Sequence, residues 1–215
     1  MSGPKDAQAV VTRWWWLRHA PVIGAGGKIY GQRDLDADTA DAARFTALAS
    51  RLPRGAVWLV SPLRRTHQTV TAIRATAPDL AELSPPIIVD ALIEQNFGAW
   101  QGLSHAEIDA SQRPAAQRFW AAPAHTRPPE GESFAELTQR LASALPNLNQ
   151  TLGGRDIIAV AHGGTIRAAL SVALALDPET ALRFSIDTLS LTRLDHISVY
   201  GHPPVWRVGA VNLVW

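Results

Sequence analysis

Short apolar runs alternate along this chain with longer segments in which apolar residues recur at helical spacing. The short runs have the length of buried strands, and the longer segments have the period of helices that cover one face of a sheet. We expect strands at residues 10–17, 57–60, 87–89, 156–161, 189–195 and 206–214. We expect helices at residues 39–52, 63–77, 132–152 (with a kink or break at Pro146) and 165–176, and a partial helix within 111–127. This alternation predicts an α/β protein, a three-layer α/β/α sandwich around a mostly parallel central sheet.

Three successive tryptophans, Trp14, Trp15 and Trp16, lie in the first predicted strand. Because side chains alternate between the two faces of a strand, these three indoles cannot all point to one side. Both faces of this strand must then be covered. We therefore expect the first strand to be central in a sheet that has helices on both sides.

Composition narrows the class of protein. Of 215 residues, 47% are hydrophobic and 18% charged, which is typical of a globular protein, so we expect one domain over residues 1–215. The net charge of +1 argues against a nucleic-acid partner. The absence of cysteine excludes disulfides and thiolate metal sites. No segment is apolar enough to span a membrane and the N-terminal residues lack a signal pattern, so we expect a cytoplasmic protein without a membrane partner.

Basic side chains follow three of the predicted strands. Arg18 and His19 follow the first strand, Arg64 and Arg65 come shortly after the second, and His162 follows the fourth. Because residues just past parallel strands line the binding crevice of an open α/β sheet, we expect these groups to converge. Arginine binds phosphate oxygens bidentately, and a neutral histidine nitrogen can attack phosphorus. The pattern therefore indicates a phosphate site.

Two helix starts and one loop extend this site. Gly163 and Gly164 open a helix whose first N–H groups would face an anion. Arg64 and Arg65 would oppose the dipole at the start of their own helix unless an anion lies there. Glu94 lies past the third strand beside aromatic residues, where partial desolvation favours the protonated acid that a leaving alkoxide needs. Taken singly, each signal has a plainer explanation as a turn, a surface arginine pair or an exposed loop carboxylate.

Taken together and in this order, five segments resemble the histidine phosphatase superfamily, in the branch that holds the cofactor-dependent phosphoglycerate mutases and many small phosphatases. The segments are Leu17-Arg18-His19, Ser61-Pro62-Leu63-Arg64-Arg65, Glu94 with Phe97-Gly98, Trp100 and Gly102, Gly131-Glu132-Ser133, and His162-Gly163-Gly164. The resemblance covers residues 14–170 and implies a phosphoglycerate mutase-like α/β/α fold.

The resemblance implies a role for each matching position. His19 matches the nucleophile that becomes phosphohistidine, and Glu94 matches the residue that acts as acid and base. Arg18 and Arg65 match the phosphate-binding arginines, and His162 matches the second histidine of the pocket. We expect His19 to be neutral, and His162 to be protonated when it binds the phosphoryl group. Because arginines neutralise the phosphate, we expect no metal and no other cofactor.

Further positions complete the family's pattern or depart from it. The amide of Gly163 is expected to bind phosphate. Gln32 is expected to do the same, because Tyr30-Gly31-Gln32 resembles the Gly-Gln segment of the phosphatase members. Residues 30–34 resemble the corresponding stretch of α-ribazole phosphatases. Ala20 stands where the family usually has glycine, which requires ordinary backbone dihedrals at this position.

These features favour a phosphomonoester hydrolase that acts on a small phosphorylated metabolite through a phosphohistidine intermediate. A cap-like insertion around residues 103–131 is expected to shape substrate choice. One alternative is a cofactor-dependent phosphoglycerate mutase or related phosphoryl transferase, but after Gly102 the chain offers Arg113, Arg118 and Arg127 without a lysine or an adjacent arginine pair. The other alternative is a binding module without catalysis. The apolar C-terminal strand is expected to form a sheet edge, which is compatible with a homodimer.

Overall fold

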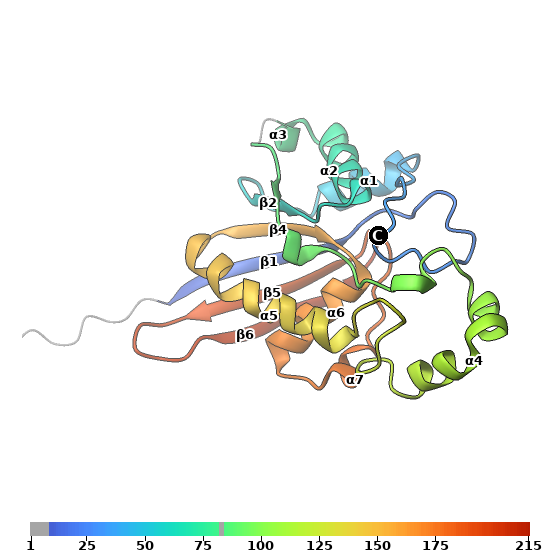
Figure 1. Ribbon diagram of the computed structural model, residues 1–215. Helices are drawn as coiled ribbons and strands as arrows, with labels where there is room; N and C mark the ends of the chain where they lie inside the picture. The colour runs from blue at the N-terminus through green and yellow to red at the C-terminus, as the bar shows by residue number, and fades with distance from the viewer. Residues whose placement is uncertain (1–8, 82–83) are drawn as a thin grey trace, which may run out of the picture.

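A computed structural model describes residues 9–81 and 84–215. Within these residues the chain forms a six-stranded sheet flanked by helices (Figure 1). The strands are β1 (Val10–Arg18), β2 (Val57–Val60), β3 (Ile87–Ile88), β4 (Asp156–Ala161), β5 (Leu191–Ser198) and β6 (Val205–Leu213). The helices are α1 (Ala42–Ala49), α2 (Arg64–Thr76), α3 (Pro78–Ala81), α4 (His105–Ala121), α5 (Phe134–Thr151), α6 (Gly163–Leu174) and α7 (Pro178–Ala181). In the described part of the chain, no helix combines the length and apolar character that a bilayer crossing requires.

The sheet has the strand order β3-β2-β4-β1-β5-β6. β3, β2, β4 and β1 pair in parallel, whereas β5 runs antiparallel to both β1 and β6. The sheet is therefore mostly parallel, as expected, and β5 is the strand that opposes the others. β1 and β4 are neighbours, and β1 runs toward the end of the molecule where α4 lies (Figure 1).

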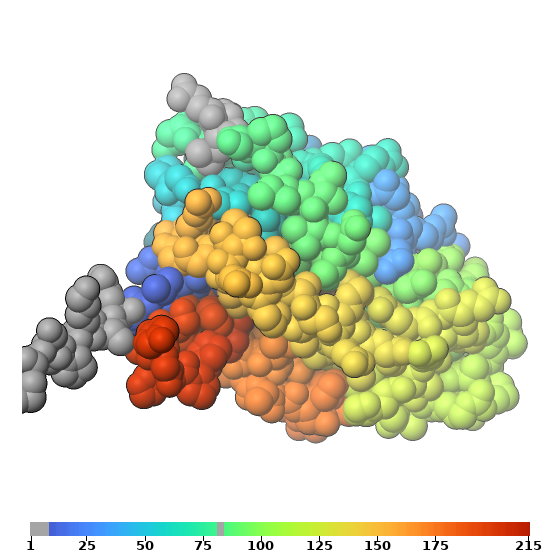
Figure 2. Space-filling model, turned by 60° about the vertical axis from the view of Figure 1, so that its left-hand side comes forward, coloured from blue at the N-terminus to red at the C-terminus, as the bar shows by residue number. Residues whose placement is uncertain are grey.

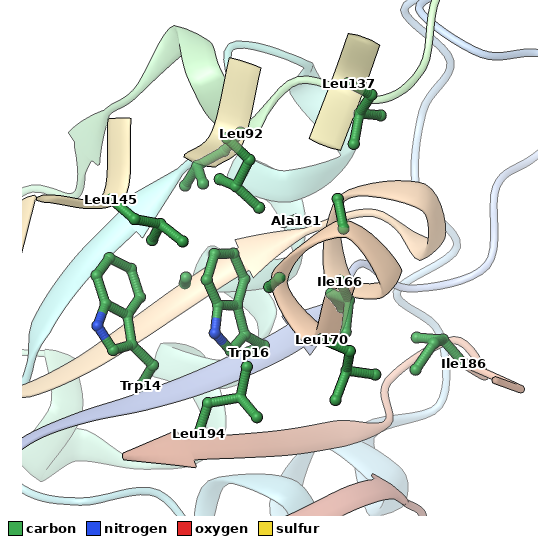
Figure 3. Packing of buried hydrophobic residues seen from close by; sticks show 14 of the residues in the cluster. Trp14, Trp16, Leu92, Leu137, Leu145, Ala161, Ile166, Leu170, Ile186 and Leu194 are labelled. Carbon is green, nitrogen blue, oxygen red and sulfur yellow. The ribbon is translucent and has the colours of Figure 1, made fainter. Parts of the chain in front are cut away.

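The tryptophan-rich strand β1 is central, as its sequence predicts. Trp14 and Trp16 are fully buried on one face of the sheet, with ring centroids 5.1 Å apart. Figure 3 shows both indoles among apolar side chains that include Leu145 from α5 and Leu170 from α6. Trp15 packs on the opposite face against a second cluster, which contains residues of α1 and α2. Helices therefore cover both faces, and the expected three-layer sandwich is confirmed.

The helix expected within 111–127 begins and ends earlier than its sequence pattern suggested. The hydroxyl of Ser104 accepts the backbone N–H of Glu107, and the carboxylate of Glu107 accepts the N–H of Ser104. This reciprocal capping box fixes the start of α4. The backbone leaves helical geometry at Gln112, two residues before Pro114, which accounts for the weak helical pattern in this segment.

The break expected at Pro146 was wrong, because α5 continues through it to Thr151. A capping box between Ser133 and Glu136 starts this helix, and its apolar face, including Leu141 and Leu145, is buried against the sheet. Packing of that face outweighs the loss of one helical hydrogen bond at proline.

A third, smaller apolar cluster lies under α4 and is separate from the two clusters on the sheet. It contains Trp100, Ile108, Ala116 and Phe119. The indole N–H of Trp100 donates to the side-chain oxygen of Gln112 at 2.9 Å, at the irregular point of the helix. Figure 2 shows the yellow-green segment that contains α4 at one end of the molecule, away from the red strands β5 and β6.

Replacing Trp14 by alanine should lower the free energy of unfolding by about 3–5 kcal/mol, because a fully buried indole leaves a cavity. The variant also loses the hydrogen bond from the indole N–H to Asn149. Trp120 is 47% exposed, so Trp120→Ala should cost less than about 1 kcal/mol and serves as the matched control. Urea unfolding followed by circular dichroism measures both values, and equal losses would contradict this account of the core.

Candidate active site

Two histidines leave neighbouring strands at the same edge of the sheet. Arg18 lies opposite Ala161 in the β1–β4 pair, and the backbone N–H of His19 donates to the carbonyl of Ala161 at 3.0 Å. His162 follows Ala161 directly and occupies the N-cap position of α6. The two imidazole centroids are 5.1 Å apart, and both side chains are buried. Rings at this separation can contact one tetrahedral oxyanion between them.

The imidazole of His19 has a defined tautomer. Its Nδ1 lies 2.6 Å from the carbonyl oxygen of Ala20, which can only accept, so Nδ1 carries the proton and Nε2 keeps a lone pair. The backbone N–H of Ala20 donates to the hydroxyl of Thr69 at 2.9 Å, which fixes this turn. Ala20 is not one of the described non-glycine residues that have a positive φ, so its backbone dihedrals are ordinary, as expected. Alanine is therefore tolerated beside His19.

Burial and positive charge keep the His19 ring neutral. Its pKa is about 3 instead of 6.5, because burial, followed by the charges of Arg65 and Arg18, lowers it, while the hydrogen bond to Ala20 opposes them. A buried imidazole that gives up its proton so readily presents an unprotonated Nε2 throughout the physiological pH range.

The His162 ring is neutral in the protein without a ligand. The Nε–H of Arg65 donates to Nδ1 of His162 at 3.3 Å, so this nitrogen is an acceptor. Its Nε2 then donates to the hydroxyl of Ser61 at 2.7 Å. Burial, followed by the nearby charges of His19, Arg65 and Arg18, holds the pKa of His162 well below 6.5.

The two adjacent arginines point in different directions. Arg65 is fully buried, donates to the carbonyls of Gly31 and Arg33 at 2.7 and 2.8 Å, and lies over the ring of Tyr30. Arg64 points outward and pairs with the carboxylates of Asp34 and Asp36.

Asp34 relieves part of the unfavourable charge at the start of α2. One oxygen of its carboxylate accepts the backbone N–H of Arg64 at 2.7 Å. The anion that was expected between the helix and its arginines is thus, for Arg64, supplied by the protein itself. Arg65 alone of the two faces the histidines.

An unsatisfied donor lies beside the start of α6. The Nε of Arg18 is buried and finds no acceptor in the described part of the chain. A Cβ built on Gly163 would lie 3.6 Å from this guanidinium, so the helix start and Arg18 are in contact. α6 begins at Gly163, two residues before the expected start, which puts both glycines in its first turn. Buried N–H groups without partners next to a helix start are a site for an anion.

Glu94 lies on the other side of this helix start. Its carboxylate accepts the backbone N–H groups of Gln95 at 2.9 Å and Gly164 at 3.2 Å. A Cβ on Gly164 would lie 2.3 Å from a carboxylate oxygen of Glu94, so only glycine allows this approach. The side-chain amide of Gln32 donates to the backbone carbonyl of Glu94 at 2.8 Å, which helps to position Glu94.

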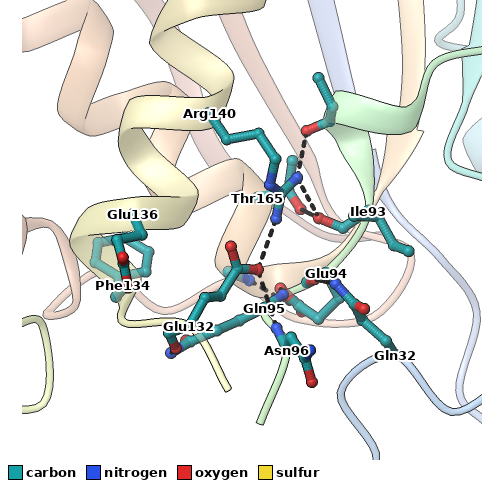
Figure 4. A network of polar contacts seen from close by, with 12 residues as sticks. Gln32, Ile93, Glu94, Gln95, Asn96, Glu132, Phe134, Glu136, Arg140 and Thr165 are labelled. Carbon is teal, nitrogen blue, oxygen red and sulfur yellow. Dashed lines mark hydrogen bonds and ion pairs between the residues drawn. The ribbon is translucent and has the colours of Figure 1, made fainter. Parts of the chain in front are cut away.

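An ion pair between Arg140 and Glu132 stabilises the segment that carries Glu94 (Figure 4). Arg140 donates to the carbonyls of Ala91 and Ile93 and to the carboxylate of Glu132. Glu132 in turn accepts the backbone N–H of Asn96 at 3.0 Å. These contacts hold residues 91–96 against the start of α5. Arg140 and Thr69 were not singled out in the sequence, because each acts on backbone groups far away in the chain.

Arg167 is a further residue at the site that the sequence analysis missed. It lies one turn after Gly163 and Gly164 on α6, donates to the carbonyl of Phe184 at 2.7 Å, and is close enough to Glu94 for their charges to interact. Burial lowers its pKa from the ordinary arginine value. The sequence did contain a sign of this role. Arg167 follows Gly164 by three positions and Gly163 by four, a spacing that puts the three residues on the same face of a helix.

A cavity of about 370 Å³ opens beside Glu94. Polar groups at one end of it belong to Glu94, Gly164 and Arg167. The rest of its lining is mainly apolar and aromatic, and comes from residues Ile29, Phe97, Phe119, Trp120, Pro123, Phe134 and Leu182, with Gln95 and His105. Within the described ranges, no cluster of three or more histidine, aspartate or glutamate side chains could hold a metal ion.

The family model of the histidine phosphatase superfamily (branch 1) matches residues 14–204, and the chain belongs to this superfamily. Among curated proteins, the glucosyl-3-phosphoglycerate phosphatase of Mycolicibacterium vanbaalenii is 33% identical over 175 residues, which cover 76% of this chain and 74% of that protein. Other relatives include bifunctional protein Rv2228c of Mycobacterium tuberculosis, 34% identical over 133 residues. That match covers 61% of this chain and 35% of the relative, so it spans about a third of that protein.

Solved structures share the fold. The mycobacterial glucosyl-3-phosphoglycerate phosphatase Rv2419c in complex with VO3 has a TM-score of 0.76 and 27% identity, over 93% of this chain and 98% of that one. A putative α-ribazole-5'-P phosphatase from Escherichia coli has a TM-score of 0.78 at 18% identity, over 94% of this chain and 96% of that one. At 18% identity, the match to the Escherichia coli protein shows a shared fold and nothing more. The mutase-like fold expected from the sequence is confirmed.

The imidazole of His19 should remain neutral from about pH 8 to about pH 5, because its pKa in the folded protein is about 3. Between pH 6.5 and 3, the imidazole of His19 binds a proton in the unfolded chain but not in the folded protein. The stability that His19 contributes is therefore complete above pH 6.5 and is lost as the pH falls toward 3. Ring nitrogen NMR measures the charge directly, with the His19→Ala spectrum as the assignment control. A His19 resonance that is half titrated near pH 6.5 would contradict the buried, neutral state.

Proposed function

We propose that this protein hydrolyses a phosphomonoester of a small metabolite through a phosphohistidine at Nε2 of His19. The observation that carries this proposal is the pair of buried imidazoles 5.1 Å apart, with an unsatisfied guanidinium N–H of Arg18 beside them. Family membership supports the same chemistry, and the relatives named as phosphatases support a small phosphorylated metabolite as substrate.

The phosphoryl group would be held by charge that the fold has already positioned. Its three equatorial oxygens carry the negative charge in the transition state. Arg18, Arg65 and the backbone N–H of Gly163 are the donors for these oxygens. A bound dianion favours the protonated form of a nearby imidazole, so His162 would gain a proton as the substrate binds and then donate to a phosphoryl oxygen. Gln32 has two proposed roles at this site: its side-chain amide holds the backbone of Glu94, and it also contacts the phosphate.

The reaction then follows in two steps. Nε2 of His19 forms a bond to phosphorus as the bond from phosphorus to the leaving oxygen breaks, and protonated Glu94 gives its proton to that oxygen. The carbonyl of Ala20 stabilises the positive charge on the phosphorylated ring through Nδ1–H. In the second step, Glu94 takes a proton from water, the water oxygen attacks phosphorus, and phosphate leaves Nε2. Both groups end in their starting protonation states.

Hydrolysis is favoured over mutase chemistry because a second anionic group would find one cation in this cavity, Arg167, whose guanidinium already donates to the carbonyl of Phe184. Arg113 and Arg118 are exposed on α4, and Arg127 pairs with Glu136. None of these three arginines lines the cavity beside Glu94. A mutase needs cations there to bind the substrate carboxylate.

Several further features belong to the same proposal. The arginines neutralise phosphate without a metal, so the enzyme works without a metal ion or another cofactor. We place the protein in the cytoplasm. It is one domain with a cap around residues 103–131. Its ligand is a small phosphomonoester, and it has no nucleic-acid or membrane partner.

The outer edge of β6 is the surface that we propose for a homodimer. Analytical ultracentrifugation tests this proposal.

Replacing His19 by alanine should reduce hydrolysis of p-nitrophenyl phosphate by at least about 1,000-fold, because the nucleophile is lost. Wild-type protein quenched during turnover should carry phosphate on His19, detected by mass spectrometry under alkaline conditions that preserve phosphohistidine. The wild-type assay is run without chelator, with chelator, and with chelator followed by excess Mg²⁺.

Arg64→Ala is the matched control, since Arg64 points outward to Asp34 and Asp36, and it should retain most of the activity. Full activity of His19→Ala would exclude the phosphohistidine route. Activity that disappears with chelator and returns with Mg²⁺ would exclude the metal-free route.

Gly164→Ala should lower kcat by about tenfold or more while leaving the free energy of unfolding nearly unchanged. The added Cβ displaces the mobile end of Glu94, whereas alanine suits a helix. The matched variant is Gly163→Ala, whose Cβ meets its neighbours at 3.5 Å or more, and it should lose less activity. Equal losses in the two variants would show that the position of Glu94 does not limit the reaction.

A further inference from the structure

The cavity beside Glu94 is charged at one end and apolar over the rest of its wall. Glu94, Gly164 and Arg167 lie at the end that adjoins Gly163 and Arg18, where the phosphoryl group would bind. The leaving oxygen would point away from His19 toward Glu94. The remainder of the alcohol would therefore enter the apolar part of this cavity.

Aromatic rings form the wall farthest from the sheet. Phe97 and Phe119 meet edge to face at 6.4 Å, and Phe119 and Trp120 at 4.8 Å. Trp120 also contacts the ring of His105 at 5.0 Å, yet it remains 47% exposed. A large indole left in contact with water at a cavity wall gains stability when a ligand covers it.

Polar partners are scarce in this part of the cavity. The polar side chains here are His105, whose ring lies against Trp120, and Gln95, whose nitrogen already donates to the carbonyl of Glu132 at 2.9 Å. A sugar or polyol bound here would lose its water and leave most of its hydroxyl groups without hydrogen bonds, which opposes binding. An apolar ring loses little on leaving water and gains contact with the aromatic wall.

We propose that this cavity selects phosphomonoesters whose alcohol carries an apolar ring, in preference to phosphates of polyols and sugar acids. Trp120 is the specificity-determining residue of that wall. The proposal rests on the proposed phosphatase function and adds the class of leaving group to it. A phenyl-sized group buried against this wall should raise kcat/KM by about tenfold or more.

The test compares 2-phenylethyl phosphate with glycerol 3-phosphate under the same conditions. Both are monoesters of primary alcohols, so the bond that breaks is chemically similar and the difference reports recognition of the alcohol. The wild-type protein should hydrolyse 2-phenylethyl phosphate with a kcat/KM at least about tenfold higher. Both activities should depend on His19.

Three variants assign the preference to the aromatic wall. In Trp120→Ala the ratio of the two kcat/KM values should fall by about fivefold or more, mainly through the KM of the phenylethyl substrate. In Trp120→Phe most of the ratio should return, because a ring is again present. Tyr200→Ala removes an aromatic side chain that is 92% exposed and lies outside this cavity, so it should leave both activities unchanged.

The outcomes separate this inference from the function on which it rests. Hydrolysis that depends on His19 but shows no preference, or favours glycerol 3-phosphate, overturns the inference and leaves the phosphatase function standing. A preference that survives in Trp120→Ala also overturns the assignment to this wall. No hydrolysis of any phosphomonoester overturns both.

Discussion

The parallel pairing of β1 with β4 is the constraint on which the site depends. It places Arg18 beside Ala161, so that the next residue along each strand is a histidine, and the bond from the His19 N–H to the Ala161 carbonyl extends the pairing to the site itself. Residues far apart in the chain meet here because the two strands are adjacent and end together. The buried indoles of Trp14 and Trp16 fix β1 between its neighbours, so the core and the site share one strand.

Burial then determines the chemical state of the groups that meet. An imidazole removed from water beside two guanidinium groups is more stable neutral, and the Ala20 carbonyl decides which nitrogen keeps the proton. The result is a lone pair on Nε2 without any separate base to remove a proton. Arg65 can be fully buried because the carbonyls of Gly31 and Arg33 share its charge. Among the described residues Arg18 has no such partner at Nε, and this difference from Arg65 points to the place of an anion.

The sequence predicted what depends on neighbours along the chain and missed what depends on distant ones. The bounds of β2 and β4 follow from local apolar runs, and the family resemblance singled out Arg65 rather than Arg64 for the site. The neutral state of His162 was not predictable, because it depends on burial and on a hydrogen bond from Arg65, 97 residues away. Pro146 suggested a break that the packing of α5 overrides. The capping box of Ser104 and Glu107 was local and readable, and its omission is what misplaced α4.

The separation of the apolar clusters bears on how such a site can change its substrate. The groups proposed for catalysis are anchored to β1, β4 and α6, whose packing belongs to the two large clusters on the sheet. The cluster under α4 stands apart from both and supplies Phe97 and Phe119 to the cavity wall, whereas Phe134 joins that wall to the large cluster. Substitution of the exposed Trp120 disturbs few contacts with the sheet, so its cost to global stability is small. The part of the wall that α4 supplies can therefore vary while the charged groups of the site are kept.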